Sequence, residues 1–236
     1  LEGIKAKYPK AKITFIRSVS REGDFDASSV KEMKKAAKKA DVIIATIGLF
    51  GDLAGEARSL SDVSPSDGQM EMLANAKATG KPVVVLVQAG RPMIMTDVVK
   101  DFNTVLYTWI GGTQHGHGVA DVLSGDVNPS AKTVMSFPVA MGQIPVYYNH
   151  YNGSRPHVDG NEGPAHFWVS RYRDIPNEPL YPFGYGLSYS SYEYSDLKLS
   201  KSSINQNESV TVSVNIKNTS DVDGTEIAQL YIRDLV

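Results

Sequence analysis

Residues 83–87 read VVVLV, the stretch that predicts a buried β-strand more clearly than any other in the chain. An apolar run without polar alternation is typical of a strand that is buried on both faces, as in a parallel sheet covered by helices. A second run of this kind, DVIIATIG, occupies residues 41–48. Together the two runs predict a parallel sheet that lies between layers of helices.

Strand and helix patterns alternate around these two runs from Lys12 to Pro138. Repeated β–α units of this size predict right-handed crossovers and a three-layer α/β sandwich with a mostly parallel sheet. The predicted strands cover residues 13–18, 41–48, 83–87 and 104–110. The predicted helices cover residues 28–40, 66–79, 93–100 and 114–123.

Two of the predicted helices carry signals at their ends. Ser29 and Glu32 have the spacing of a capping box, and so do Ser66 and Gln69. Gly80 follows the second of these helices, at the position where a glycine in the left-handed region commonly ends a helix. These signals predict where each helix begins and where the second one ends.

The pattern changes after Pro138. Residues 141–192 are rich in Pro, Gly, Asn and Tyr, and predict a long irregular segment whose aromatic residues pack on the α/β part or on another surface. From Tyr194 the apolar period becomes two, and the sequence predicts strands over residues 209–218 and 226–234. About three strands cannot close a sandwich core, which takes about seven in immunoglobulin-like domains.

The predicted organisation is therefore an α/β sandwich followed by a partial antiparallel β-sandwich. The α/β sandwich covers residues 1–140, the irregular aromatic-rich segment covers residues 141–192, and the incomplete β domain covers residues 193–236. The chain begins without Met and ends within an apparent strand pattern, so we expect a piece of a longer protein.

The composition is that of an ordinary globular protein, with 42% hydrophobic and 21% charged residues. The net charge of −2 gives no reason to expect nucleic acid or an anionic membrane as a partner. No apolar run approaches the ~20 residues of a membrane-spanning helix. The chain contains no cysteine, which excludes disulfides and thiolate metal sites.

A glycine-rich turn, GGTQHGHG at residues 111–118, lies between a predicted strand and helix, where a phosphate cradle would sit. Its glycine spacing does not fit a dinucleotide fingerprint, and a packing turn is favoured. His115 and His117 have no Cys, Asp or Glu at the spacing of a zinc site, so we predict no metal and no cofactor. The roles of three further histidines stay open: His150, His157 and His166.

The loop after the strand at residues 41–48 contains the sequence LAGEARSLSD at residues 53–62. Open α/β sheets gather their ligands at the carboxyl ends of parallel strands, so this loop is a candidate site. Glu56 is its candidate chemical group, although most loop carboxylates are simply solvated. Arg58 is its cationic neighbour.

Six segments in collinear order resemble glycoside hydrolase family 3, in its β-glucosidase-like branch. Single segments of this kind would be weak indicators, whereas the ordered set is highly specific and runs through most of the chain. The segments are GEARSLSD, ATGKPVVVLVQAGRP, ADVLSGDVNPSAKTVMSFP, GQIPVYYNHYNGSRP, PLYPFGYGLSYSSYEYS and VDGTEIAQLYIRD.

The resemblance implies a larger enzyme. Family members begin with a (β/α)8 barrel that carries an aspartate nucleophile, continue with an α/β sandwich, and often add a fibronectin type III-like domain. This chain matches the second part and the start of the third, so the barrel and the nucleophile would lie outside it. Glu56 matches the glutamate that acts as general acid/base in a G-E-A-R-S-R-like motif, and Arg58 would orient its loop or contact substrate. Retaining hydrolysis would place Glu56 and the barrel aspartate roughly 5–5.5 Å apart.

The sequence departs from the family pattern at a few positions. Leu60 stands where members usually carry a second Arg, and Gly111 and Gly112 stand where Pro-Gly is usual. His115 and His117 stand where Gly and Asn are common. These departures bear on loop geometry and on the fit of the substrate rather than on family membership.

We therefore expect the C-terminal part of a retaining, β-glucosidase-like hydrolase that acts on terminal β-D-glycosidic bonds. Its partners would be a carbohydrate substrate, either a β-glucoside or an oligosaccharide, and the missing N-terminal barrel. The parent protein would be periplasmic or secreted, and the chain alone would be inactive. Two alternatives stay open, a non-catalytic carbohydrate-binding or scaffolding module and a nucleotide- or flavin-binding domain.

Overall fold

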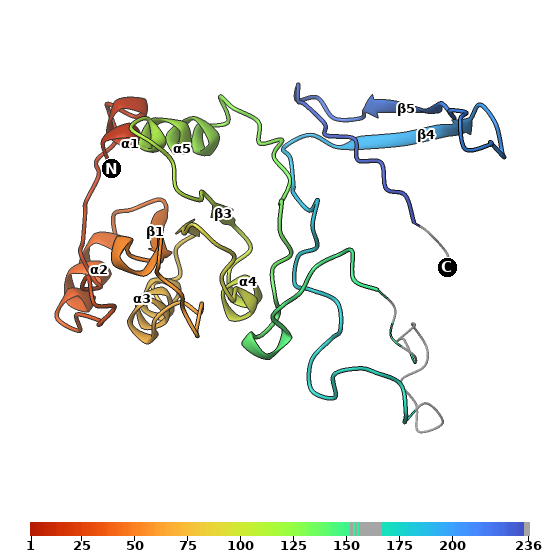
Figure 1. Cartoon of the computed structure of the whole chain (residues 1–236). Helices are drawn as coiled ribbons and strands as arrows, with labels where there is room; N and C mark the ends of the chain where they lie inside the picture. Colours follow the sequence, from red (N-terminus) through yellow and green to blue (C-terminus); the bar gives the residue numbers. More distant parts are fainter. Residues whose placement is uncertain (152, 154, 156–166, 234–236) are drawn as a thin grey trace. The chain divides into compact units, whose positions relative to one another are not determined.

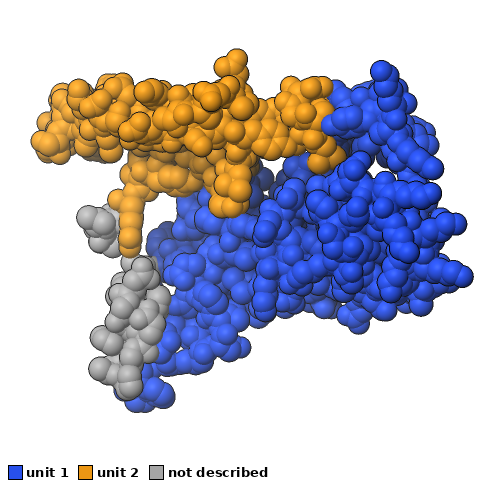
Figure 2. Space-filling model, turned by 180° about the vertical axis from the view of Figure 1, so that it is seen from behind, with its two compact units in different colours: residues 1–120, 133–183 blue, residues 121–132, 184–236 orange. Residues whose placement is uncertain are grey.

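The computed structural model describes residues 1–151, 153, 155 and 167–233 (Figure 1). Contacts divide the chain into two compact units, which Figure 2 colours separately. Unit 1 comprises residues 1–120 and 133–183, and unit 2 comprises residues 121–132 and 184–236. The domain boundaries at residues 140 and 192 stay a prediction.

Unit 1 is built on a parallel sheet with the strand order β1-β2-β3. The strands are β1 (Ile43–Gly48), β2 (Val83–Gln88) and β3 (Val105–Tyr107). Helix α3 (Asp67–Lys77) connects β1 to β2, and α4 (Thr96–Asp101) connects β2 to β3. Both helices lie on the same side of the sheet in Figure 1, as right-handed crossovers in one direction require.

The other helices complete three layers. Helix α2 (Ser29–Ala37) lies on the side of α3 and α4, whereas α1 (Glu2–Lys7) and the start of α5 (His115–Ser124) lie on the opposite side (Figure 1). Gly3 of α1 is buried against the backbone of Gly116, an approach that a Cβ atom would block. The predicted α/β sandwich is confirmed. Among the described residues, none of the helices has the length and apolar content that crossing a membrane would require.

The core of unit 1 lies between the sheet and α3 and α4. Leu73 of α3, Val85 and Val87 of β2, and Met93 and Met95 ahead of α4 are each no more than 1% exposed. Each such side chain contributes about 1.5–3 kcal/mol by leaving water. The apolar run that predicted the sheet thus supplies the centre of the core.

The two predicted buried strands differ in their surroundings. In β2, Val85 and Leu86 point to opposite faces and are 0% and 8% exposed, so both faces are covered. In β1, Ala45 and Ile47 are buried on one face, but Ile44 on the other face is 36% exposed. The prediction that β1 is buried on both faces is wrong: β1 is an edge strand of the described sheet, and its second face, which carries Ile44 and Thr46, is exposed.

The predicted strand over residues 13–18 is also wrong. These residues join no ladder, and Phe15 is 68% exposed. The nearby backbone pairing is a single antiparallel bridge between Val19 and Phe25. An apolar stretch of this kind favours an extended backbone, but a strand also needs a hydrogen-bonded neighbour.

The strand predicted over residues 104–110 is shorter than expected. Beyond β3, the backbone N–H and the hydroxyl of Thr108 both donate to the Val87 carbonyl, at 2.8 and 3.0 Å. Trp109 then adopts a φ of +54°, which turns the chain out of the sheet. The sequence does not mark this turn because Trp is rarely found in left-handed backbone.

The helix signals have mixed outcomes. The Ser66 hydroxyl caps α3 by accepting from the Gln69 N–H at 3.3 Å, and Gly80 has a φ of +73°, so the predicted start of α3 and the glycine at its end are confirmed. The Gln69 side chain binds Gly48, so the second half of this capping box is not formed. The box at Ser29 is wrong, because α2 is preceded by Ser28 and the Ser29 hydroxyl donates to the Asp26 carbonyl at 2.7 Å. Asp26 instead accepts from the Ser28 N–H at 2.9 Å.

Part of the irregular segment is fixed by one buried side chain. Gln143, at the end of the short 3-10 helix η2 (Met141–Gln143), is 4% exposed. Its Nε2 donates to the carbonyls of Pro176, Asn177 and Glu178, at 3.2, 3.0 and 3.0 Å. This part of the segment is therefore ordered by side chain–backbone bonds rather than by a ladder.

The aromatic residues of the same segment behave in two ways. Tyr181 packs edge to face on Phe137, whose ring also contacts Tyr107 and Trp109 of the α/β part. This confirms the predicted packing for Tyr181. Other aromatic side chains of the segment are more than half exposed: Tyr147, Tyr148, Tyr151, Phe167 and Trp168.

Unit 2 contains an antiparallel pair of strands, β4 (Tyr192–Leu199) and β5 (Val212–Asn218). The predicted partial β domain is confirmed in this form. The strand predicted over residues 226–234 is wrong for its described part, which joins no ladder. In that part the Gln229 side chain donates to the Gly184 carbonyl at 2.9 Å, so side chains hold the segment.

Asn128 ties three segments of unit 2 together. Its Nδ2 donates to the Ser190 hydroxyl at 2.7 Å and to the Asp223 carbonyl at 2.9 Å. Its Oδ1 accepts from the Ser188 hydroxyl at 2.9 Å and from the Tyr189 N–H at 2.8 Å. The motif ADVLSGDVNPS thus carries an amide whose hydrogen-bonding capacity is filled within unit 2.

The buried position of Leu73 yields a test of the core. We expect Leu73→Ala to lower the free energy of unfolding by about 2–5 kcal/mol, because the substitution leaves a cavity between α3 and the sheet. Glu71→Ala, at an exposed position of the same helix, is the control and should change it by less than about 0.5 kcal/mol. Urea unfolding of the purified chain measures both, and equal shifts would contradict the assigned core.

Candidate functional site

The loop that carries Glu56 begins at the carboxyl end of β1. It opens with the short 3-10 helix η1 (Gly51–Leu53) and ends at Ser66, the N-cap of α3. The side chain of Glu56 is exposed, and among the described residues its carboxylate has no hydrogen bond or ion pair. Glu56 is therefore accessible to a group that approaches the loop from outside.

The side chain of Arg58 binds the first residues of the same loop. Its Nη1 donates to the Gly51 carbonyl at 2.8 Å and lies 3.5 Å from Oδ1 of Asp52. The other carboxylate oxygen of Asp52 accepts from the guanidinium of Arg21. Arg58 therefore holds together the two ends of the segment that contains Glu56. Asp52 links this segment to Arg21, in the N-terminal part of unit 1.

Sequence reasoning missed Arg21 and Asp52. These two residues are 31 positions apart, and no local spacing connects them. Because the loop is exposed, ion pairs of this kind contribute only about 0–1 kcal/mol each to stability. Their effect is on the conformation of the loop rather than on the fold.

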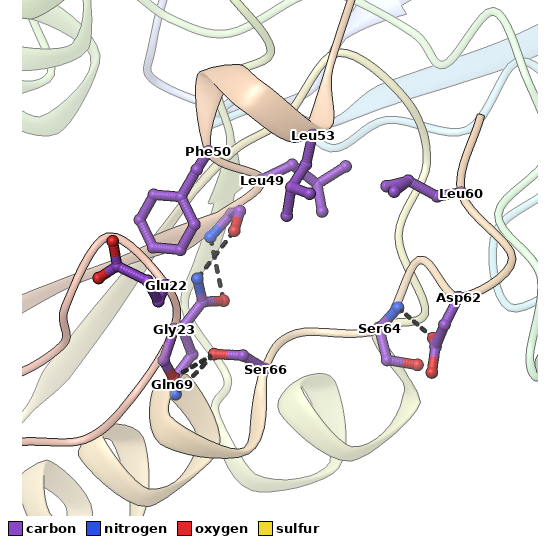
Figure 3. Close-up of a pocket in the computed structure, with 11 residues that line it drawn as sticks. Glu22, Gly23, Leu49, Phe50, Leu53, Leu60, Asp62, Ser64, Ser66 and Gln69 are labelled. Atoms are coloured by element: carbon purple, nitrogen blue, oxygen red, sulfur yellow. Dashed lines mark hydrogen bonds between the residues drawn. The ribbon is translucent and has the colours of Figure 1, made fainter. Parts of the chain in front are cut away.

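A pocket of about 90 Å³ lies beside the loop (Figure 3). It is far smaller than the roughly 300–1,000 Å³ of a complete small-molecule site, so it holds at most one edge of a ligand. Glu56 does not line it. Its apolar side chains are Leu49, Phe50, Leu53 and Leu60, and its polar side chains are Glu22, Asp62, Ser64, Ser66 and Gln69.

Two polar side chains build the floor of this pocket (Figure 3). The Gln69 amide donates to the Gly48 carbonyl at 2.8 Å, and its oxygen accepts from the Gly48 N–H at 3.3 Å. The Ser66 hydroxyl donates to the Gly23 carbonyl at 3.0 Å. The end of β1, the start of α3 and the turn at Gly23 are thereby held together.

Asp62 in this loop and Tyr107 of β3 have shifted pKa values. The hydroxyl and N–H groups of Ser64 hold the pKa of Asp62 below its ordinary value, because both bind the charged form. Burial raises the pKa of Tyr107 above its ordinary range, against the smaller opposite effect of a backbone hydrogen bond with Met93. Asp62 is therefore anionic and Tyr107 neutral over the range in which proteins usually work.

The histidines that the structure describes do not gather into a site. Nδ1 of His115 accepts from the Gly111 N–H at 3.2 Å, which fits the predicted packing turn, and His117 is exposed on α5. His150 contacts the Tyr151 carbonyl at 3.2 Å. Two further candidates lie outside the described residues: His157 and His166. In the part of the chain that the structure describes, no three His, Asp or Glu side chains are grouped as metal ligands.

The architecture and the loop sequence agree with a known family. Residues 1–189 match the glycosyl hydrolase family 3 C-terminal domain. The chain belongs to this family. The resemblance inferred from the six segments is thereby confirmed.

Several family 3 relatives resemble the chain over nearly its whole length. A periplasmic β-glucosidase of Salmonella typhimurium is 41% identical over 206 residues, which cover 87% of this chain and 26% of the relative. A β-xylosidase of Formosa agariphila is 36% identical over 235 residues, 99% of this chain and 31% of the relative. The chain thus spans roughly a quarter to a third of the length of these relatives.

A solved structure shows the same fold. The crystal structure of a β-glucosidase from Listeria innocua has a TM-score of 0.85 and 37% identity, and the match covers 94% of this chain and 30% of that one. The same β-glucosidase in complex with glucose gives a TM-score of 0.81 and 40% identity over 85% of this chain. The Listeria innocua β-glucosidase therefore contains a region with the fold described above.

The contacts of Arg58 yield a test of the loop. We expect Arg58→Ala to speed amide hydrogen exchange over residues 51–58, because the bond that closes the loop is lost. The unfolding midpoint should barely change, since the groups involved are exposed. Hydrogen-exchange mass spectrometry on the purified chain is the measurement.

Arg17→Ala removes an exposed arginine of unit 1 outside this loop and is the matched control. It should leave the exchange of residues 51–58 unchanged. Equal protection of the loop in both variants would mean that Arg58 does not hold it.

Proposed function

We propose that the chain is the C-terminal part of a retaining, β-glucosidase-like glycoside hydrolase in which Glu56 is the general acid/base. The observation that carries the proposal is the position of Glu56: it stands in the family motif GEARSLSD, on an exposed loop at the carboxyl end of β1. Arg58 orients this loop through its bond to Gly51. No metal or cofactor is needed for this chemistry.

The proposed reaction divides its two carboxyl groups between two domains. An aspartate on an N-terminal (β/α)8 barrel attacks the anomeric carbon, while Glu56 in its protonated form gives its proton to the leaving oxygen. Glu56 then removes a proton from the water that hydrolyses the glycosyl–enzyme intermediate. A carboxyl group that points away from its own domain suits this division, because the cleft forms only when the two domains meet.

The barrel is a proposed partner for a second reason. The relatives are about three to four times as long as the region they share with this chain, as their 26% and 31% coverage indicates. The proposed substrate is a carbohydrate with a terminal β-D-glycosidic bond, in keeping with relatives named β-glucosidase and β-xylosidase. A periplasmic or secreted location is proposed from the periplasmic β-glucosidase of Salmonella typhimurium.

One observation favours a second candidate function, a non-catalytic carbohydrate-binding or scaffolding module. Several exposed aromatic side chains of the irregular segment, including Tyr151 at 96% and Trp168 at 73% exposure, offer flat apolar surface to a partner. Binding of glucose oligomers by the chain, unchanged by Glu56→Gln, would support this function. Calorimetric titration of the purified chain with oligosaccharides separates the two candidates.

The division of the carboxyl pair predicts that the chain alone is inactive. We expect the purified chain to hydrolyse p-nitrophenyl β-glucoside no faster than buffer, because the nucleophile is missing. Released nitrophenolate is the readout, and the whole polypeptide that contains this chain is the positive control. Turnover well above buffer by the chain alone would contradict the proposal.

The proposed acid role predicts an effect that depends on the leaving group. In the whole polypeptide, Glu56→Gln should lower kcat/KM for methyl β-glucoside by about 100-fold or more, because that leaving oxygen needs a proton. The loss for a dinitrophenyl β-glucoside should be less than about tenfold, since its leaving group departs without one. Initial rates with both substrates give the ratio.

Glu71→Gln, at an exposed position of α3, is the matched control and should leave both rates unchanged. Azide, a nucleophile that needs no general base, should raise kcat of the Glu56→Gln variant with the activated substrate. Equal losses on the two substrates would remove the acid role from Glu56.

A further inference from the structure

The backbone on both sides of Glu56 lies in the left-handed region. Gly55 has a φ of +132° and Ala57 has a φ of +58°. Glycine adopts such values freely, whereas the Cβ atom of alanine makes them sterically unfavourable. Strain of this kind persists only where surrounding contacts impose it, and it is concentrated at functional sites. The turn at Glu56 is therefore imposed by contacts from elsewhere.

Core packing does not supply these contacts. None of residues 51–60 is buried. Within the loop, the bond from Arg58 to the Gly51 carbonyl closes the turn, but it leaves the closed turn unattached to the sheet. The Arg21–Asp52 ion pair anchors the start of the loop, and a second contact from another part of unit 1 reaches the residues that follow Glu56.

Arg91, in the connection from β2 to α4, reaches the loop. Its Nη2 donates to the Arg58 carbonyl at 3.0 Å. Its own carbonyl accepts from the Tyr107 hydroxyl at 2.5 Å, and the Tyr107 ring packs edge to face on Trp109 and Phe137. A chain of contacts thus leads from the aromatic part of the core through Arg91 to the residue that closes the Glu56 loop.

We propose that Arg91 is a positioning residue for Glu56. The inference rests on the proposed function of Glu56 and names a group that this function needs. Arg91 holds the peptide that follows Arg58, Arg58 holds Gly51, and Glu56 lies between these two fixed points. A proton donor displaced by about 1 Å loses roughly 10²-fold in rate, so an anchor at this place acts on proton transfer.

The test is Arg91→Met in the whole polypeptide that contains this chain. The substitution keeps an unbranched apolar stem and removes the donor to Arg58. We expect kcat/KM for methyl β-glucoside to fall by about tenfold or more, and that for a dinitrophenyl β-glucoside to fall by less than about threefold, because only the first needs a proton. A purely structural role would lower both in proportion to the folded fraction.

Two further variants keep the test decisive. Arg91→Lys keeps the charge but offers a point donor in place of a planar fork, and it should affect the two substrates in the same order with a smaller difference between them. It also replaces Arg91→Met in the test if that variant does not fold. Arg17→Met, at an exposed site of unit 1, is the matched control and should leave both substrates unaffected.

The outcomes separate this inference from the proposed function. If Glu56→Gln distinguishes the two substrates and the Arg91 variants do so in the same direction, Arg91 positions Glu56. If Glu56→Gln distinguishes them while the Arg91 variants lose both equally or lose neither, the positioning role is refuted and the function stands. If Glu56→Gln does not distinguish them, the function itself fails and the inference fails with it.

Discussion

The side-chain amide of Gln69 binds both backbone polar groups of Gly48, and the candidate site depends on this pair of hydrogen bonds. The bonds measure 2.8 and 3.3 Å, and Gln69 is 4% exposed. Gly48 ends β1 with a φ of +149°, and a Cβ atom there would lie 1.9 Å from the Gln88 carbonyl oxygen. Because Gln69 stands in the first turn of α3, the end of the strand and the start of the helix are fixed to each other.

Much of unit 1 follows from local sequence. Four β-branched residues in VVVLV predict β2, and the hydroxyl of Ser66 before an apolar helix face predicts the start of α3. The two wrong strands have a common cause. Residues 13–18 and the described part of residues 226–234 have strand-like apolar content but no adjacent strand, and a ladder is a property of two segments. Single-sequence patterns report one segment at a time.

The site was predictable only where it is local in sequence. Glu56 and Arg58 were found by the resemblance of one short motif, and the conformation around them was not. The Arg21–Asp52 pair spans 31 residues and the bond from Arg91 to Arg58 spans 33, and composition or spacing does not connect such positions. The sequence also does not predict the left-handed backbone at Ala57, since alanine rarely adopts this conformation.

The loop between Gly48 and Ser66 has two rigid ends and an unburied middle. Residues of this interval that neither hold the turn nor carry the proposed acid are consequently free to change while the sheet and α3 keep their packing, since changes of surface loops cost little in chain entropy. For an engineer, the same two ends mark the places where another loop can be spliced in. The transplanted loop also has to offer a carbonyl to Arg91, because this arginine lies outside the exchanged interval.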